Sequence, residues 1–388
     1  MNILNIEKLN AFEEAIKSYS QEFRDIGLII DEQPDRLHEF TDLASVQLLS
    51  RMMIPSEYND HPFIINNTKF YGLTCIERVI GTEWLSYGDA GVVVGCPGPS
   101  LSGIIIQDFA DGQQKEQYYS KLLSKPCWTF FALTEPNKGS DAMHIETNMK
   151  KVNACDGQRL LNGEKYFIGN GTRAEIGVVF ARTTTGPIGI EMCLIEKDSD
   201  GFSAEALDTL GLRAPKLSRL TFQNVRINEE QIIGRHLSPL KRGMHGAITV
   251  FNKMRPTVAA MALGVSQATY DYMITNKKNL SLDQQQKLEN FQNELITTRN
   301  LIRQAALEVD INPRNGYVGS IAKVRATSLV KQITQYALDL FGEGAFFEHP
   351  YLNKWFRDAF AFENMEGTSN ILKLNIFQSY MNGKISYV

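Results

Sequence analysis

The stretch "FALTEPNKGSDA" (residues 131–142) stands where the sequence changes from helical to strand-like patterning. Thr134-Glu135-Pro136 followed by Gly139-Ser140-Asp141 predicts a polar loop whose free backbone N–H groups suit an anionic ligand. Taken alone, an ordinary surface turn explains the stretch equally well. The segments on either side decide between these interpretations.

Strand-like segments follow this loop. "LNGEKYFIGNGTRAE" (161–175) contains Asn162-Gly163, a strong hairpin signal, and the predicted hairpin returns Phe167 towards the first loop. Packing of Phe167 in a β core is the alternative. Residues 176–183 and 189–198 are short apolar runs, and 217–227 alternates apolar with polar residues. We therefore predict a compact β domain over residues 126–232.

Helical spacing dominates both flanks of this β domain. It predicts helices at 5–24, 35–53, 75–86, 111–123, 242–275, 283–308, 317–341 and 368–380. "GCPGPSLSG" (95–103) is predicted to be a loop, either buried or lining a site, because its Gly and Pro residues forbid a continuous helix. The expected organisation is an N-terminal helical domain over 1–125 and a C-terminal helical bundle over 233–388.

The composition narrows the functional class. A chain of 388 residues with 43% apolar residues and a net charge of −4 is typical of a globular protein in aqueous solution, with nothing that recruits nucleic acid or a membrane. The N-terminus predicts a surface helix rather than a signal peptide, so we expect a cytoplasmic protein. The five cysteines lack a C-x-x-C pair and predict reduced thiols rather than a disulfide or metal site: Cys75, Cys96, Cys127, Cys155 and Cys193.

A lone carboxylate precedes the last predicted helix in "FENMEGTSNILK" (362–373). One interpretation is a helix start, with Thr368 or Ser369 as the cap, Gly367 as the turn and Glu366 placed favourably near the helix N-terminus. The other interpretation gives Glu366 a chemical role. Just upstream, Arg357 and Asp358 are expected to form structural ion pairs.

Taken together, these stretches resemble the acyl-CoA dehydrogenase family over nearly the whole chain. "TEPNKGSDA" is similar to the family's TEP-x-x-GSD signature, "LGLRAPKLSRLTFQNVRI" to its last β-domain strand, and "FNKMRPTVAAMALG" (251–264) to its first C-terminal helix. "LFGEGAFFEHPYLNKWFRDAFAFENMEGTSNI" resembles its final signature. The resemblance implies an α+β multidomain fold with an N-terminal all-α domain, a central β-barrel and a C-terminal four-helix bundle. It also implies FAD between barrel and bundle, and a homodimer or homotetramer.

The same resemblance implies a role for Glu366. In the family, the Glu before Gly-Thr is the base that removes the α-proton of an acyl thioester, while the β-hydrogen leaves as hydride to flavin N5 and a trans-2-enoyl product forms. Because the α C–H bond is only weakly acidic, the carboxylate needs a desolvated site, which Met365 and Phe362 are expected to supply. The Glu366 N–H is expected to hold the thioester carbonyl together with a ribityl hydroxyl.

Further site residues are carried over by their place in the family motifs. The expected cofactor-binding residues are Phe131, Leu133, Thr134, Ser140, Phe167, Ile168, Gly169, Thr368 and Asn370. The expected substrate-binding residues are Ser140, Met254, Arg255, Met365 and Gly367, and no metal ligand is expected. Met254 occupies the position from which some branches of the family supply the base; since it cannot accept a proton, Glu366 is the one base candidate that fits.

The chain departs from the family pattern at several positions. Gly169 replaces the Thr whose hydroxyl bonds N5, and a polar connection (275–291) replaces the R-x-x-FG segment. Asp339 and Glu343 add carboxylates near the expected pyrophosphate, where Arg314 or Lys323 would have to compensate them. Pro215 and Leu217 stand where polar residues face the substrate side.

These departures leave several functions open. The leading interpretation is an acyl-thioester dehydrogenase acting on acyl-CoA or on an acyl-carrier protein in a biosynthetic pathway, with an electron-transfer flavoprotein or O2 as acceptor. A flavin oxidase or monooxygenase on the same scaffold is the second, although retention of the EGT glutamate argues against a monooxygenase. A non-catalytic structural or carrier-binding subunit is the third.

Overall fold

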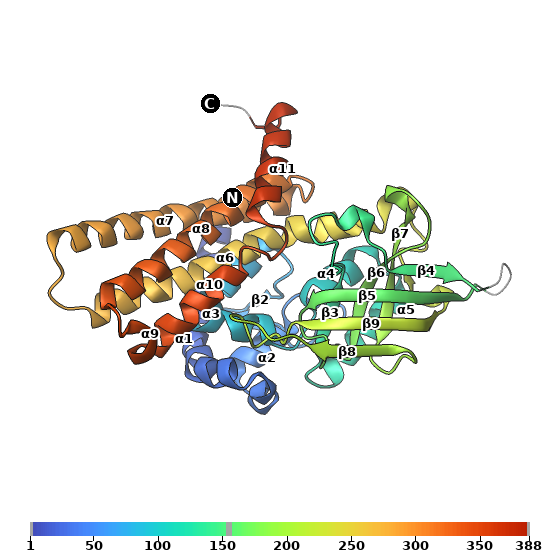
Figure 1. The fold of residues 1–388 in the computed structure, drawn as a ribbon, viewed down its shortest axis with the longest axis horizontal. Coiled ribbons are helices and arrows are strands. Elements are labelled where there is room, and N and C mark those ends of the chain that lie inside the picture. The colour runs from blue at the N-terminus through green and yellow to red at the C-terminus, as the bar shows by residue number, and fades with distance from the viewer. Residues whose placement is uncertain (1–2, 153–156, 386–388) are drawn as a thin grey trace.

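The computed structural model describes residues 3–152 and 157–385, so Cys155 lies outside the described residues. Figure 1 shows helices from both ends of the chain gathered on one side and a β-sheet built from the middle of the chain on the other. This is the predicted order of a helical region, a β region and a helical region. The exact domain boundaries at 125/126 and 232/233 stay predictions.

The N-terminal region is mainly helical. Its elements are α1 (Ile3–Glu32), η1 (Pro34–Phe40), α2 (Ala44–Arg51), β1 (Phe63–Ile65), β2 (Thr68–Phe70), α3 (Cys75–Gly95), α4 (Ser100–Phe109) and α5 (Gly112–Ser124). The β1–β2 hairpin was not predicted. Asn66 and Asn67 form its two-residue turn and both have positive φ (46° and 61°), which a tight hairpin turn of this kind requires.

The Gly- and Pro-rich stretch breaks the chain between α3 and α4. α3 runs beyond the predicted residue 86 to Gly95, bending at Asp89, whose φ of −158° and ψ of 115° are not helical. Only residues 96–99 separate it from α4, so the predicted loop at 95–103 is shorter than expected. No single helix in the described part of the chain is long and apolar enough to cross a membrane; α3 and α4 pass that test by length and composition only as a pair, bent by 76°.

The middle of the chain forms an eight-stranded sheet. Its strands are β3 (Thr129–Ala132), β4 (Asn148–Lys151), β5 (Arg159–Ile168), β6 (Ile176–Arg182), β7 (Ile190–Glu196), β8 (Phe202–Ala206), β9 (Ser218–Ile227) and β10 (Ile232–Ile233). Their order is β10-β7-β6-β4-β5-β9-β8, with β3 parallel to β6. In the pairings of the described residues β10 and β8 stand at opposite ends of this order, and this β-sheet domain lies between two helical regions as predicted.

The predicted hairpin at Asn162-Gly163 is wrong. β5 continues through both residues and pairs with β4 on one side and β9 on the other, with a register shift between Leu161 and Gly163. Gly163 has a φ of 141°, and a Cβ there would stand 2.6 Å from the Thr147 Cα, so glycine is needed where residue 147 approaches β5, next to the bulge that β5 forms with β9, rather than for a turn. Asn162 accepts a hydrogen bond from the Asn224 N–H at 2.9 Å, which stabilises the bulge.

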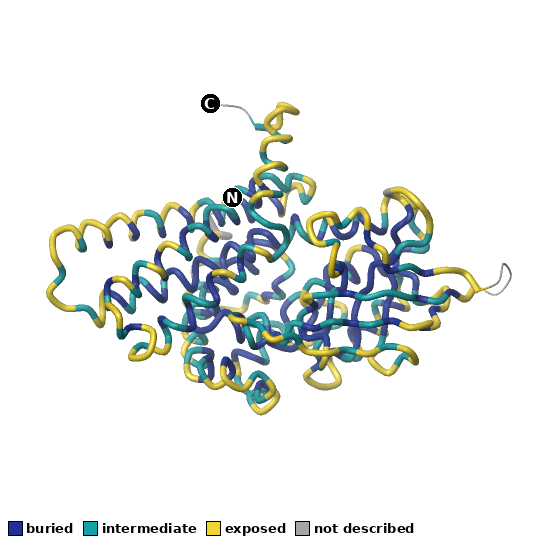
Figure 2. The backbone as a smooth tube through the Cα atoms, viewed as in Figure 1, coloured by how far each residue is buried: buried dark blue, intermediate teal, exposed yellow. Residues whose placement is uncertain are grey.

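The C-terminal region is helical. Its elements are α6 (Met244–Asn276), α7 (Leu282–Ile311), α8 (Gly316–Phe341), α9 (Ala345–Glu348), α10 (Pro350–Ala361) and α11 (Ser369–Met381). Four of them match predicted helices, and α9 and α10 were not predicted. Figure 2 shows buried inner faces along α3, α6 and α8, whereas α11 projects from the body and is largely exposed.

One hydrophobic core joins helices from both ends of the chain. It contains Phe12 and Phe23 of α1, Val79 of α3, and Leu263 and Leu329 of α6 and α8. A separate core inside the sheet is formed by residues 130–232 alone. α6 therefore lies between the N-terminal helices and the rest of the bundle.

Arg357 and Asp358 form the expected ion pairs, with partners far away in the sequence. Arg357 pairs with Asp31 of α1. Asp358 accepts from the Lys354 ammonium at 2.6 Å and from the Leu212 N–H at 2.6 Å, and Lys354 also contacts Asp89 at 2.9 Å. These fully buried groups connect α10, the bend of α3 and the β8–β9 loop.

Candidate functional site

Glu366 lies on the loop between α10 and α11. Its φ is 50° and that of Gly367 is 105°, so the backbone passes through the left-handed region at both residues. Although Glu366 as a whole is partly exposed, its Oε2 atom is buried and has no hydrogen-bond partner in the described residues. The side chain is therefore held in a desolvated position without a direct partner at that oxygen.

Arg255 of α6 holds this loop from one side. Its Nε donates to the Glu366 carbonyl at 3.2 Å, and its Nη1 donates to Asn252 Oδ1 at 3.0 Å. A Cβ on Gly367 would stand 3.9 Å from Arg255 Nη2. The three expected site residues Glu366, Gly367 and Arg255 are thus brought together.

Lys323 of α8 holds the same loop from the other side. Its side chain is fully buried, and Nζ donates to the Glu363 carbonyl at 2.8 Å and to the Gly367 carbonyl at 2.6 Å. Lys323 is therefore not available to compensate Asp339 and Glu343, as the sequence had suggested. Asp339 accepts instead from Gln335, and Glu343 is exposed.

The start of α11 is capped differently from the prediction. Neither Thr368 nor Ser369 uses its side chain as a cap; Glu363 Oε1 accepts from the Ser369 N–H at 2.8 Å. The other Glu363 oxygen pairs with Lys331 at 3.0 Å. Because Glu363 takes over the capping, the helix-start interpretation does not account for Glu366.

The electrostatics of the loop favour a base that works near neutral pH. Burial raises the pKa of Glu366 to about 7, and the charges of Lys323 and Arg255 oppose that rise. Burial also lowers the pKa of Lys323 to about 8 and that of Arg255 to about 10, with Glu366 opposing both shifts. A carboxyl group whose pKa is close to the working pH is suited to general-base chemistry.

The first loop, "TEPNKGSD", is anchored through its glutamate. The Glu135 carboxylate accepts from the Glu146 and Thr147 N–H groups at 2.6 and 2.9 Å and pairs with the fully buried Lys165 at 2.9 Å. Lys165 also donates to the Leu133 carbonyl at 2.9 Å. Glu135 therefore fixes the shape of the loop, and the flanking Thr134 stays partly exposed.

The second loop lies beside the first. The Tyr166 N–H donates to the Thr134 carbonyl at 2.8 Å, so β5 returns towards the first loop even though no hairpin forms at Asn162-Gly163. Phe167 has a φ of 58° and is 58% exposed, which excludes packing in the β core. The next residue, Ile168, is buried in the core of the sheet.

Arg173 fixes the far end of the second loop. Its guanidinium donates to Asn170 Oδ1 at 2.7 Å, to the Gly95 carbonyl at 2.9 Å and to the Ala214 carbonyl at 2.5 Å. One side chain thereby joins this loop to the end of α3 and to the β8–β9 connection. Gly169 therefore lies in a frame formed by the second loop, the end of α3 and the β8–β9 connection, which Arg173 holds together.

α6 connects the sheet to the Glu366 loop. Phe131 packs edge-on against Phe251 of α6 with 6.1 Å between ring centroids, and Leu133 and Met254 belong to the same hydrophobic cluster. Arg255, which binds the Glu366 carbonyl, directly follows Met254. Met365 is half-buried against the helical core.

Other expected site residues are not joined to this cluster. Ser140 and Asn370 are exposed, and within 3–152 and 157–385 no hydrogen bond or ring contact connects them to Glu366. Thr368 is partly buried. The described residues contain no group of three His, Cys, Asp or Glu side chains placed to hold a metal ion.

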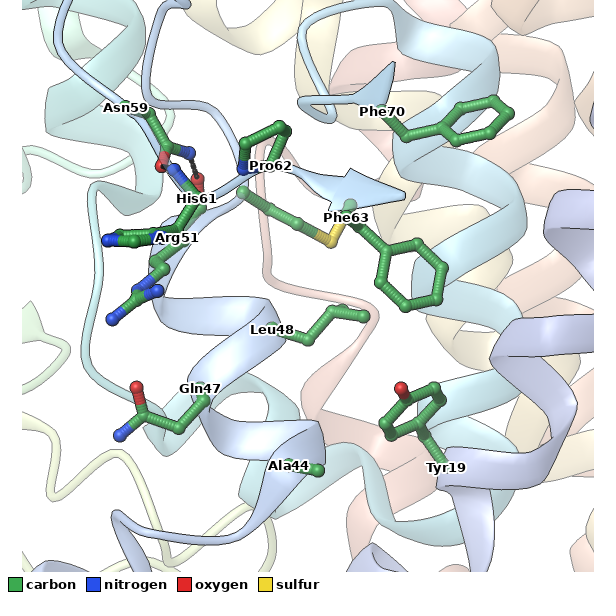
Figure 3. Close-up of a pocket in the computed structure, with 11 residues that line it drawn as sticks. Tyr19, Ala44, Gln47, Leu48, Arg51, Asn59, His61, Pro62, Phe63 and Phe70 are labelled. Atoms are coloured by element: carbon green, nitrogen blue, oxygen red, sulfur yellow. Dashed lines mark hydrogen bonds between the residues drawn. The ribbon is translucent and has the colours of Figure 1, made fainter. Parts of the chain in front are cut away.

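A cavity of about 220 Å³ lies in the N-terminal region, away from these loops. Figure 3 shows its lining, which includes Tyr19, Leu48, Arg51 and Phe63. No predicted site residue lines it. The cavity is therefore separate from the candidate site.

Sequence reasoning missed the side chains that hold the site loops: Asn252, Lys323, Glu363, Lys331, Lys165 and Arg173. One signal could have found Lys323. Lys323 lies on the face of α8 that carries Gly319, Ala326 and Val330. These residues recur every three to four positions and are all buried. A lysine at such a position needs an internal partner.

Comparisons with known proteins agree with this arrangement. Residues 130–225 match the family model described as "Acyl-CoA dehydrogenase, middle domain", and residues 241–381 match "Acyl-CoA dehydrogenase, C-terminal domain". The chain is 30% identical over 316 residues to a short-chain specific acyl-CoA dehydrogenase of Clostridium acetobutylicum, covering 78% of this chain and 81% of that protein.

Solved structures share the fold. A glutaryl-coenzyme A dehydrogenase in complex with glutaryl-CoA superimposes with a TM-score of 0.84 at 23% identity, covering 97% of this chain and 95% of that one. The prolyl acyl carrier protein oxidase AnaB superimposes with a TM-score of 0.80 at 20% identity, covering 98% and 99%.

Proposed function

Because the chain belongs to the acyl-CoA dehydrogenase family, we propose that it is an FAD-dependent oxidoreductase that introduces an α,β double bond into an acyl thioester, with Glu366 as the base. The observation that carries the proposal is the buried Oε2 of Glu366, without a hydrogen-bond partner, on a loop held by Arg255. A partner-free, desolvated carboxylate is basic enough to accept a proton from carbon.

The residues around this site fit FAD. Thr134 and Tyr166 join the two loops, and the exposed Phe167 offers a flat apolar surface beside Gly169, where a Cβ would meet nothing nearer than Pro215 Cβ at 3.9 Å. Phe131, Leu133, Thr134, Ser140, Phe167, Ile168, Gly169, Thr368 and Asn370 are the residues proposed to hold the cofactor. When bound, FAD supplies the acceptor for the β-hydrogen, which leaves as hydride.

The chain's own residues would remove the α-proton and bind the thioester oxygen. The Glu366 carboxylate accepts the α-proton, so that charge develops on the thioester oxygen. The Glu366 and Gly367 N–H groups have no acceptor among the described residues, and the left-handed backbone at both positions suits them to bind that oxygen. Met254 and Met365 provide apolar surroundings that exclude water, and Arg255 keeps the loop in place.

The carrier of the acyl group is a finer proposal. We favour a carrier-protein thioester because residues 275–291 replace the family's R-x-x-FG segment and because the fold resembles that of a prolyl acyl carrier protein oxidase. Gly169 leaves open space in this frame, which also supports O2 as an alternative to an electron-transfer flavoprotein as the acceptor. We further propose a homodimer or homotetramer, since α11 exposes Leu374, Phe377 and Met381.

Anaerobic titration of the purified flavoprotein tests the proposal. A panel of CoA and carrier-protein thioesters is added while the flavin absorbance is followed, and the proposal expects bleaching by at least one of them. Glu366→Gln should keep FAD but lose bleaching, whereas Glu289→Gln, on an exposed face of α7, should behave like the wild type.

Several results would count against these assignments. Undiminished bleaching of Glu366→Gln would contradict its role as base. Comparable turnover of free acyl-CoA and carrier-protein thioesters would contradict the carrier preference. A colourless protein that takes up no FAD would favour a non-catalytic member of the family.

A further inference from the structure

Lys323 contacts the Glu366 loop at two carbonyls that flank the base. The Glu363 carbonyl lies three residues before Glu366 and the Gly367 carbonyl one residue after it, and Nζ donates to both. One ammonium group therefore bridges the segment on either side of Glu366. This bridge constrains the backbone while leaving the carboxyl Oε2 free.

Close packing of α8 on α6 places Lys323 at this position. A Cβ on Gly319 would stand 3.2 Å from Pro256 Cδ and 3.6 Å from Arg255 Cβ, so a larger residue there would push the two helices apart by a few tenths of an ångström. Lys323 lies one turn further along α8. The same helix pair thus supplies both cations of the site, Arg255 and Lys323.

The other contacts of the loop are made by Glu363. Lys331 pairs with the Glu363 carboxylate, which also accepts from the Ser369 N–H. The charged groups that act on Glu366 are Lys323 from α8 and Arg255 from α6, with the Lys323 contribution the larger. Glu363 and Lys331 act in turn on Lys323.

Resting on the function proposed above, we propose that Lys323 is a positioning residue for Glu366, which fixes the loop by bridging two carbonyls and keeps the buried carboxyl ionisable through its positive charge. A buried lysine is costly unless it is hydrogen-bonded and faces a negative group. Both conditions are met here, because the ammonium donates to two carbonyls and faces the Glu366 carboxyl. These interactions offset the cost of burying the ammonium.

Lys323→Met tests the charge, and Lys331→Met is the matched control because it removes a lysine from the outer side of the same loop. The readout is an infrared pH titration of the protonated Glu366 carboxyl, identified as the band absent from Glu366→Gln. In the wild type the midpoint is expected near pH 7. Lys323→Met should raise it by about one pH unit or more, and Lys331→Met should leave it within about 0.3.

A second variant separates the bridge from the charge. Lys323→Gln keeps N–H donors but no charge, so the midpoint should rise as in Lys323→Met, while hydrogen exchange of residues 363–369 should increase less. If Lys323→Met does not fold, Lys323→Gln carries the test. A midpoint unchanged from the wild type in a folded, flavin-containing variant overturns the proposal.

Catalysis provides an independent arm. At pH 7 the rate of flavin reduction in Lys323→Met should fall about fivefold or more, with most of the loss recovered at higher pH and little change in KM. A loss that does not depend on pH overturns the positioning role. A wild type that no thioester reduces refutes the function proposed above, while an infrared shift in that same protein still supports the coupling of Lys323 to Glu366.

Discussion

Pro215 lies against Gly169: a Cβ built on Gly169 would stand 3.9 Å from Pro215 Cβ, and the N–H of Asn170 donates to the Pro215 carbonyl at 2.6 Å. Gly169 and Pro215 are two separate departures from the family pattern in the sequence. In the structure they are neighbours, and both belong to the frame that Arg173 holds. The space beside Gly169 is therefore a defined feature of the second loop.

Gly169→Thr is expected to fold as stably as the wild type, because its Cβ meets only an ordinary van der Waals contact and its φ is not in the left-handed region. The added hydroxyl restores the group that bonds N5 in the family, so the flavin reduction potential should change. Thermal unfolding and a redox titration check both statements.

Gly171→Ala is the matched control for that prediction. Its Cβ would stand 2.7 Å from Leu220 Cδ2 and from Ser218 Cβ, so we expect a loss of about 1–3 kcal/mol in the free energy of unfolding. Equal destabilisation by both substitutions would show that the space beside Gly169 is closed.

Glu366→Gln should stabilise the protein at alkaline pH. Since the folded-state pKa is raised to about 7 from 4.5, the folded protein binds this proton more tightly than the unfolded chain, and wild-type stability falls as pH rises between about 4.5 and 7. The destabilisation by the buried, ionised Glu366 is fully present above about pH 7 and absent below about pH 4.5. We expect a gain of roughly 1–3 kcal/mol at pH 8 and almost none at pH 4.

Urea unfolding of both proteins at the two pH values measures this difference. If Glu366→Gln raised the free energy of unfolding equally at pH 4 and pH 8, ionisation of the Glu366 carboxyl would not be the cause of the destabilisation.

Glu363→Ala should lower the free energy of unfolding by about 1–2 kcal/mol, because it removes the cap of α11 and the ion pair with Lys331. Burial alone would raise the pKa of Glu363, but the hydrogen bonds from Ser369 and the charge of Lys331 lower it on balance. The contribution is therefore present above about pH 4.5 and is lost as pH falls through the lowered pKa.

Ser369→Ala serves as the comparison, since it removes only the Ser369 side-chain hydrogen bond to Glu363 while the backbone N–H still donates. It should cost about 0.5–1 kcal/mol, less than Glu363→Ala. A larger effect of Ser369→Ala than of Glu363→Ala, measured by thermal unfolding, would restore the cap predicted from the sequence.

Lys354→Met should be strongly destabilising, by about 3–5 kcal/mol, because it leaves Asp89 and Asp358 buried without their shared cation. Lys197→Ala removes a half-exposed ion pair with Glu175 and should cost less than about 1 kcal/mol. Chemical denaturation compares the two, and similar losses would contradict a structural role for the buried trio.

Local signals predicted the helices and the base, whereas the contacts that organise the site are not local. Glu366 was found because Glu-Gly-Thr is contiguous. Its neighbours Arg255 and Lys323 are 111 and 43 residues away in the sequence, and no periodic pattern connects them. Only the close packing of α6 on α8 brings both to one loop.

The errors have physical causes of the same kind. Asn-Gly permits a positive φ, which a bulge uses as readily as a turn, and the partner strands β4 and β9 decided in favour of the bulge. α10 was not predicted, although Pro350 suits the first position of a helix. The α11 cap was misassigned because Glu363 reaches it from six residues upstream.

The shared helical core also bears on how the chain is made. During translation α1 and α3 emerge from the ribosome well before Leu263 and Leu329, which complete their core. The apolar faces of these N-terminal helices therefore stay exposed until α6 and α8 have been made. One of the two cores to which the sheet contributes comes from residues 130–232 alone and can form in the interval, whereas the other needs Met254 of α6 as well. Burial of apolar side chains would therefore begin within the sheet, and the N-terminal helices, although translated first, would be among the last elements to be covered.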